Sequence, residues 1–329
     1  MQTQILETLQ QTSYSQQKTL LRCPKRYEYH YIRKLRPKRD DNRFLLGRAV
    51  HKFLEDYYSA QIVKDGILPA SKEQAFATGF QTFKQYVEEH FPDDEEAFQQ
   101  ADLAENIIKN YHDWAKENDD FSVLGTEVPF EFEVANAKFR GVFDGIVERG
   151  GKYWILEHKT ATQIKTEHTL RDKQISVYVL AAQTLGVPVS GVIYNTLKKA
   201  VPQKPKILKS GKLSKSLGQN ITYESYLQAI HELGQSPSLY EDVLSQLRER
   251  ENPFFHRESV TRTEETAKAV LKDIEQTEKL KQGIVQAGYF PRNDTKDCAW
   301  DCPFSELCLA ELEGADTRPL LADKYKIVS

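Results

Sequence analysis

Gly141-Val-Phe-Asp144 and Ile155-Leu-Glu157-His-Lys159 are the stretches that decide the fold of this chain. Because successive side chains of a strand alternate between two faces, Glu157 and Lys159 point one way and His158 points the other way. Between the two stretches, Arg149-Gly-Gly-Lys152 predicts a tight turn that joins antiparallel strands. Such a hairpin brings Asp144 beside Glu157, so the sequence predicts two carboxylates and a lysine close together.

This residue set suits the hydrolysis of a phosphodiester. Two carboxylates provide the oxygen ligands that Mg²⁺ or Mn²⁺ prefers. A bound metal polarises a phosphoryl oxygen and lowers the pKa of its water, while Lys159 would orient that water and offset charge in the transition state. The alternative is an ordinary amphipathic hairpin with a surface Glu and Lys, because E-x-K is a common pattern.

Two pairs of residues, each spaced by four on a predicted helix, add to this set. His51 and Glu55 share one face of a helix expected at 43–60. His51 is either a further metal ligand that favours Mn²⁺ or a histidine packed in the core. Gln174 and Tyr178 lie on a helix expected at 170–185. They would either grip a phosphate and a base near the scissile bond or form an ordinary surface pair.

The order G-x-x-x-H, G-x-x-D, E-x-K and Q-x-x-x-Y, from Gly47 to Tyr178, resembles the PD-(D/E)XK nuclease superfamily. The chain looks like its RecB-like branch, which includes the CRISPR-associated RecB-like exonucleases and the AddB-type nucleases. The similarity runs from about Ser13 to Cys308. The fold it implies is an α/β, restriction-endonuclease-like core, in which helices flank a mixed central sheet. A helical N-terminal region and a C-terminal cysteine cluster would complete it.

The resemblance also implies roles for individual residues. The metal ligands would be His51, Asp144, Glu157 and the backbone carbonyl of His158. Lys159 would be the catalytic lysine, with Gln174 and Tyr178 placing the substrate. The implied activity is a Mg²⁺- or Mn²⁺-dependent DNA exonuclease on single-stranded or resected ends, with 5′→3′ polarity, in recombination, repair or DNA processing.

The four cysteines form a second constellation, with Cys23 early and Cys298, Cys302 and Cys308 late. No signal peptide is recognisable, and a cytoplasmic setting disfavours disulfides, so a metal centre is the favoured interpretation. The residues leave an iron–sulfur cluster, Zn²⁺ and free thiols open. The resemblance favours a [4Fe–4S] cluster, although the spacing C-x₃-C-x₅-C departs from the commonest family pattern. Either metal would join the N-terminal helix to the C-terminal tail.

Positive charge is concentrated in two regions, although the net charge of the chain is only −3. Arg22, Lys25 and Arg26 belong to a basic, tyrosine-containing segment that extends to Arg39 and suits single strands. Lys198 and Lys199 open a lysine-rich stretch, 198–215, which predicts a flexible arm or long loop that reaches DNA. We expect these five residues to bind DNA, although a solvated basic loop is the plain alternative.

Helical patterns dominate the first third of the chain, followed by three strands, a helix and another strand. The expected division is a helical region at 1–120, a nuclease core at 121–262 and a C-terminal helix with the cysteine tail at 263–329, integrated into one nuclease domain. A composition of 40% hydrophobic and 28% charged residues is typical of globular proteins, and no apolar stretch is long enough to span a bilayer.

No G-x-x-x-x-G-K-[ST] motif is present, so we expect no ATP hydrolysis and no unwinding by this chain. A helicase, a recombinase or a CRISPR adaptation protein from another gene would be its partner. The alternatives are a catalytically inactive DNA-binding or scaffold subunit of a recombination complex, an endonuclease, and a redox or regulatory protein built around the cysteines.

Overall fold

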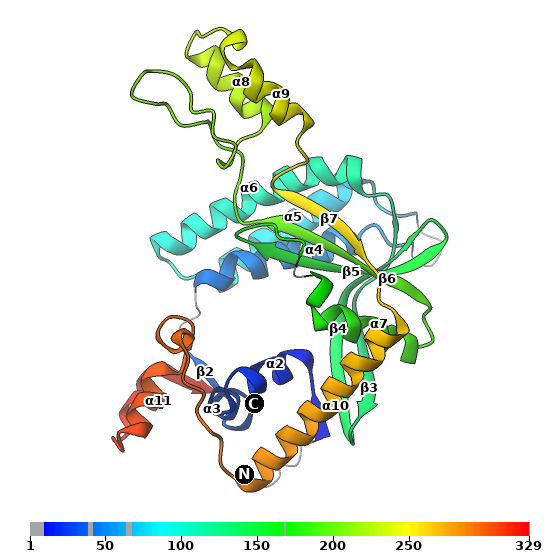
Figure 1. The fold of residues 1–329 in the computed structure, drawn as a ribbon, viewed down its shortest axis with the longest axis vertical. Helices are drawn as coiled ribbons and strands as arrows, with labels where there is room; N and C mark the ends of the chain where they lie inside the picture. Colours follow the sequence, from blue (N-terminus) through cyan, green and yellow to red (C-terminus); the bar gives the residue numbers. More distant parts are fainter. Residues whose placement is uncertain (1–9, 39–41, 64–67, 168, 329) are drawn as a thin grey trace.

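The computed structural model describes residues 10–38, 42–63, 68–167 and 169–328. Figure 1 shows a twisted sheet at the centre of the molecule, with helices on both faces and smaller structures at either end. The sheet contains β1 (Gln11–Thr12), β3 (Ser122–Val134), β4 (Ala137–Arg149), β5 (Lys152–Ala161), β6 (Val189–Lys198) and β7 (Phe255–Val260). Its strands follow the order β1-β4-β5-β6-β7, and β3 pairs with β4. Parallel and antiparallel pairs both occur, so the predicted mixed sheet is confirmed.

Helices cover each face of the sheet over a separate hydrophobic cluster. One face packs against α4 (Leu45–Ser59), α5 (Lys72–His90) and α6 (Glu95–Asn118), and the other against α7 (Lys173–Thr184) and α10 (Glu264–Ala287). On β5, Leu156 joins the first cluster and Ile155 the second, as strand alternation requires. α4 and α7 agree with the helices expected at 43–60 and 170–185 to within a few residues.

The predicted hairpin between β4 and β5 is confirmed. Arg149 pairs with Lys152, and Gly150 and Gly151 have φ angles of 60° and 72°. Left-handed φ at both turn positions matches the twist of antiparallel strands, which is why Gly-Gly suits this turn. The ladder extends only to the pair Gly145–Leu156. Beyond it, the start of β4 pairs with β1 instead, so β4 and β5 diverge where Asp144 and Glu157 lie.

The N-terminal region contains α2 (Tyr14–Arg22), α3 (Pro24–Tyr27) and a π-helical turn, η1 (Glu28–Ile32). Ser13 caps α2, and the helix ends at extended Cys23 before Pro24. A short 3₁₀ turn, η2 (Asn42–Phe44), precedes α4. Arg39, a member of the predicted basic segment, lies outside the described residues.

An insertion, residues 199–254, leaves the sheet between β6 and β7 and forms its own small unit, labelled by α8 (Tyr223–Glu232) and α9 (Glu241–Glu249) in Figure 1. The 3₁₀ turn η4 (Pro237–Tyr240) joins the two helices. Leu213 of the lysine-rich stretch packs with Tyr226 and Tyr240 in a separate core. Of the two expectations, a flexible arm or a long loop, the structure agrees with the loop, within which Ile207 bridges to Leu213 and closes a small hairpin.

The C-terminal tail packs on the N-terminal helices. It contains η5 (Lys296–Ala299), α11 (Ser305–Leu312), α12 (Arg318–Lys324) and β8 (Tyr325–Ile327), and β8 pairs with β2 (Leu35–Pro37). Tyr29 and Leu35 share a small hydrophobic cluster with Phe304, Leu307 and Tyr325. Elsewhere in the chain, the short 3₁₀ turn η3 (Thr169–Arg171) precedes α7. Within the described residues, no helix is long and apolar enough to cross a bilayer.

Candidate active site

Asp144 lies at the point where β4 and β5 separate. The backbone N–H of His158 has no ladder partner there and donates instead to Asp144 Oδ2 at 2.7 Å. In an antiparallel arrangement, the N–H and C=O of one strand residue point to the same side. The carbonyl of His158 therefore also faces the gap beside Asp144. The carboxylate is mostly buried, and burial raises its pKa to about 6.

Glu157 is the next group in this gap and is only 2% exposed. Its Oε1 accepts a hydrogen bond from Lys159, two residues along the same strand face. Its Oε2 is buried and has no hydrogen-bond partner in the described part of the chain. Burial, followed by the negative charge of Asp144, raises the pKa of Glu157 to about 7. Burial tends to lower the pKa of Lys159, but Glu157 raises it above its usual value, so the ammonium stays charged.

His51 reaches the same gap from α4. The helix approaches β5 closely at Gly47, where a Cβ would lie 3.0 Å from Thr160 Oγ1. This close approach explains the glycine four residues before the histidine. His51 Nδ1 lies 3.9 Å from Asp144 Oδ2. Burial and then the charge of Lys159 lower the pKa of His51, so its imidazole is neutral and able to ligate a metal.

Gln174 and Tyr178 reach the site from α7, which Asp172 caps. The Gln174 amide donates to the Tyr178 hydroxyl at 2.7 Å, and this hydroxyl donates to the carbonyl of Val142 at 3.3 Å. Burial, Glu157 and Asp144 all raise the pKa of Tyr178, which keeps the phenol protonated. The pair is therefore part of the site and not a surface pair.

Glu127 of β3 is a carboxylate near the site that the sequence patterns did not single out. Burial and the charges of Glu55 and Glu157 raise its pKa. Its φ of 48° is unusual for a residue other than glycine. No motif includes Glu127, and its position depends on how β3 pairs with β4. Only a prediction of that register would have found it.

The carboxylates fit a cation. A buried carboxylate oxygen without a partner is costly, and two carboxylates with raised pKa values repel each other unless a positive charge intervenes. Across the residues that the structure describes, no three His, Cys, Asp or Glu side chains already form a closed metal-binding group. His51, Asp144 and Glu157 would therefore have to close around an ion by small side-chain movements.

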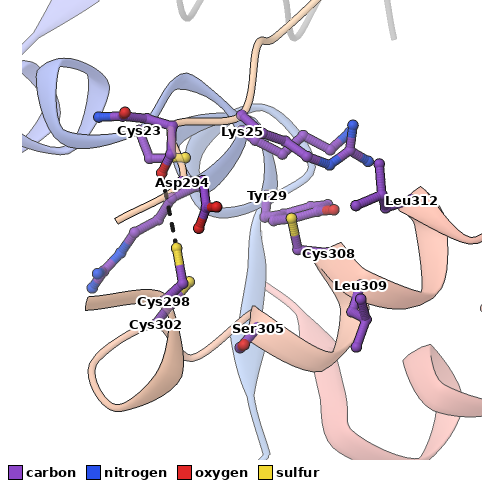
Figure 2. Close-up of a pocket in the computed structure, with 13 residues that line it drawn as sticks. Cys23, Lys25, Tyr29, Asp294, Cys298, Cys302, Ser305, Cys308, Leu309 and Leu312 are labelled. Carbon is purple, nitrogen blue, oxygen red and sulfur yellow. Dashed lines mark hydrogen bonds between the residues drawn. The ribbon is translucent and has the colours of Figure 1, made fainter. Parts of the chain in front are cut away.

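The four cysteines line a second cavity, of about 460 Å³, between the N-terminal helices and the C-terminal tail. All four thiols are free. Figure 2 shows Cys298 and Cys302 together on the tail, Cys23 above them, and Cys308 across the cavity beside Tyr29. Burial and the neighbouring Cys298 and Cys23 raise the pKa of Cys302. Lys25, Arg26 and Arg292 also line the cavity, so positive side chains surround the sulfur atoms.

The three basic residues expected to bind DNA near the N-terminus make ion pairs with the tail. Arg22 lies 2.9 Å from Asp297 and 2.6 Å from Asp301. Lys25 pairs with Glu28 and Glu311, and Arg26 lies 3.7 Å from Asp301. Lys198 is the last residue of β6 and pairs with Ala161, the last residue of β5, two positions beyond Lys159. The backbone N–H of Lys199 donates to the carbonyl of Ala161. The ammonium groups of Lys198 and Lys199 donate to Asn220 and to the carbonyl of Arg43.

Comparison with known proteins identifies a family and a related solved structure. A "putative exonuclease" from Eubacterium rectale has a similar solved structure, with a TM-score of 0.51 and 14% identity over 89% of this chain and 88% of that chain. At this identity the likeness shows the fold alone. No curated protein sequence is a significant match. The family model of the PD-(D/E)XK nuclease superfamily matches residues 11–309. The chain belongs to the PD-(D/E)XK nuclease superfamily.

Proposed function

We propose that this protein is a Mg²⁺- or Mn²⁺-dependent DNA exonuclease that acts on single-stranded or resected ends. The observation that carries the proposal is the pair Glu157 and Lys159 on one strand, with the buried Oε2 of Glu157 left without a hydrogen-bond partner in the described chain. Asp144 lies across the gap and His51 beside it. Acidic oxygens, one neutral imidazole and one ammonium are the groups that phosphodiester hydrolysis needs.

Each residue has a distinct task in this proposal. Asp144, Glu157, His51 and the carbonyl of His158 would hold the metal, which supplies Lewis-acid activation of water and of the phosphoryl group. Lys159 keeps its proton and holds the attacking water while it offsets negative charge on the phosphate. Gln174 orients the Tyr178 hydroxyl, and this pair contacts the nucleotide next to the scissile bond.

Exonuclease action and 5′→3′ polarity rest on the resemblance to the RecB-like branch. The solved structure from Eubacterium rectale carries the description "putative exonuclease", which agrees with this choice. DNA would approach along Lys198 and Lys199, with Arg22, Lys25 and Arg26 contributing to the electrostatic field on the side of the N-terminal helices. A helicase, recombinase or CRISPR adaptation protein would supply the single strand.

We also propose that Cys23, Cys298, Cys302 and Cys308 hold a [4Fe–4S] cluster. The support is that the four thiols line one cavity, of about 460 Å³, which has more room than a single metal ion needs. The surrounding Lys25, Arg26 and Arg292 compensate the negative charge of a thiolate-bound cluster. Zn²⁺ is the alternative occupant. The centre joins Cys23, after α2, to the tail.

The test of exonuclease action compares linear and circular single-stranded DNA of the same sequence. Linear strands labelled at the 5′ or the 3′ end, with Mg²⁺ or Mn²⁺, should be degraded while the circle survives. Immediate release of short labelled products from the 5′ end alone would support 5′→3′ polarity. Cleavage of the circle at a comparable rate would replace the proposal with an endonuclease.

A further inference from the structure

A row of polar side chains crosses the sheet directly beneath the candidate active site. His158 on β5 is the register partner of Asn195 on β6, which is the register partner of Arg257 on β7. All three are buried, with His158 3% and Asn195 0% exposed. They lie on the face that α4 and α6 cover, where the surrounding residues of the sheet and helices form the larger hydrophobic cluster.

Hydrogen bonds link this row to two tyrosines from the covering helices. The Asn195 amide donates to the Tyr111 hydroxyl at 2.9 Å and lies 2.8 Å from His158 Nδ1. The hydroxyls of Tyr111 and Tyr58 are 2.7 Å apart. The ring of Tyr58 stacks on the ring of His158, with centroids 5.3 Å apart and planes within 12°. The stacked Tyr58 ring therefore fixes the orientation of the His158 ring plane, and Asn195 fixes the position of its Nδ1 edge.

An ion pair anchors the far end of the row. Arg257 lies 2.8 Å from Asp119, at the end of α6, and donates to the Tyr111 hydroxyl at 3.1 Å. Both charged side chains are almost fully buried, at 7% and 3% exposure. Tyr58 also donates to Asp119, at 3.3 Å. The network thus runs without interruption from Asp119 and Arg257 to the ring of His158.

Burying a polar network costs more free energy than filling the same space with apolar side chains. Each buried polar group must regain the hydrogen bonds it loses from water, and a buried ion pair is often no more stabilising than apolar residues of similar volume. Stability therefore does not explain why six polar side chains occupy an apolar face. Hydrogen bonds and the Arg257–Asp119 ion pair connect the members of the network, although Asn195 Oδ1, Asp119 Oδ2 and Arg257 Nε have no partner among the described residues. Connected buried networks hold their members in a preferred geometry.

At its near end, the network meets the candidate active site at His158. Its backbone N–H donates to Asp144 at 2.7 Å, and its carbonyl faces the same gap. Its ring meets the ring of His51 edge-on, with centroids 6.3 Å apart and planes at 85°. His158 therefore contacts both Asp144 and His51 without presenting its side chain to the cation position.

We propose that the side chain of His158 is a positioning residue: the Asn195–Tyr111–Arg257–Asp119 network fixes the His158 peptide, which in turn sets Asp144 and His51 for metal binding. This inference rests on the proposed function, because it assumes that Asp144 and His51 hold the metal. Outer hydrogen-bond partners of metal ligands typically change metal affinity by about 10- to 100-fold when they are removed.

The experiment measures Mn²⁺ binding by electron paramagnetic resonance on the whole protein without DNA, beside the rate of DNA cleavage as a function of Mn²⁺. His158→Phe keeps an aromatic ring under Tyr58 but removes the Nδ1 contact with Asn195. Tyr111→Phe removes only one hydroxyl and is the milder second variant. Ile193→Val is the matched control, because Ile193 is buried in the same cluster and lies two residues from Asn195, outside the polar network.

We expect His158→Phe to weaken Mn²⁺ binding about 10- to 100-fold and to raise the Mn²⁺ needed for cleavage by a similar factor. Tyr111→Phe should weaken binding less, and Ile193→Val should leave it unchanged although it also removes a buried methyl group. Wild-type Mn²⁺ affinity in a folded His158→Phe or Tyr111→Phe protein would overturn the positioning role. If the wild-type protein binds no Mn²⁺ and cleaves nothing, the proposed function fails as well.

Discussion

Lys159 forms an ion pair with Oε1 of Glu157, two residues earlier on the same strand face, and leaves Oε2 of that carboxylate without a hydrogen-bond partner among the described residues. The lysine therefore does not fully satisfy the carboxylate. A buried glutamate with one oxygen paired and one oxygen open is arranged to bridge an ammonium and a second cation. In this arrangement Glu157 binds the metal and Lys159 assists the reaction, so substitution of one residue tests one role without removing the other.

Asp144→Asn should abolish stabilisation by Mn²⁺, because the amide replaces a charged oxygen ligand with a neutral one. At 100 times its Kd, a ligand that binds only the folded state stabilises it by about 2.7 kcal/mol. Wild-type protein should therefore melt at a higher temperature with saturating Mn²⁺, and Asp144→Asn should melt at the same temperature with or without it. An equal Mn²⁺-dependent rise in Tm in both proteins would show that the cation binds elsewhere.

Cys302→Ser should lose the metal centre and lower the Tm, because the centre links the tail to the N-terminal helices across most of the chain. Iron, zinc and sulfide content and the visible absorption spectrum of the purified protein measure the loss and identify the group. Ser305→Ala is the control, since Ser305 lines the same cavity without offering a thiolate. Metal content that is the same in Cys302→Ser and wild-type protein would refute the four-cysteine site.

Lys281→Met should destabilise the fold by about 3–5 kcal/mol, because it leaves the charge of Glu278 buried without its partner. The two side chains are 1% and 0% exposed and lie 2.6 Å apart. Thr12 and Gln17 also donate to Glu278, so this pair attaches β1 and α2 to α10. Urea unfolding measures the change.

The double variant Glu278→Gln/Lys281→Met should recover more than half of that loss, because the amide oxygen still accepts from Thr12 and no charge remains. If the single and the double variant are equally stable, the unpaired charge of Glu278 is not the cause of the destabilisation.

A triple variant of the insertion should bind single-stranded DNA more weakly, and its affinity should depend less on salt. It combines Lys206→Glu, Lys209→Glu and Lys212→Glu. The three lysines are exposed on the hairpin of the insertion, whereas Lys204 and Lys215 pair with Glu232 and Asp242. Each lost phosphate contact lowers the slope of log K against log salt by about 0.7 on a single strand. Fluorescence anisotropy at several salt concentrations measures it. Lys272→Glu on α10 is the control, and an unchanged slope in the triple variant would mean that the hairpin does not touch DNA.

Local sequence patterns predicted the β4–β5 hairpin that carries the candidate site, because each step of its formation depends on residues close together in the sequence. Gly150 and Gly151 determine the turn, the turn determines the register, and the register brings Asp144 to the His158 peptide. The helices around His51 and Gln174 followed from periodicity, and the structure brings both residues to the gap.

The remaining features depend on contacts between distant segments, which no local pattern contains. The pairing of β1 with β4 is only two residues long and lies beyond the point where the β4–β5 ladder ends. The row His158–Asn195–Arg257 requires the registers of two further strand pairs. The buried side of His158 was predictable from strand alternation, but its hydrogen-bond partners were not. The small core under the lysine-rich stretch was not predicted, because it depends on Leu213 meeting α8 and α9.

The most direct test of the central claim compares wild-type protein with Lys159→Ala and Lys152→Ala on end-labelled single-stranded DNA, with Mg²⁺, Mn²⁺ or chelator. Lys152 is exposed at the turn of the same hairpin and serves as the matched control. The account predicts metal-dependent cleavage by wild-type and Lys152→Ala protein. It also predicts a loss of at least about 100-fold in Lys159→Ala, which still binds Mn²⁺. Cleavage by Lys159→Ala at the wild-type rate, or equal cleavage in chelator, would contradict the account.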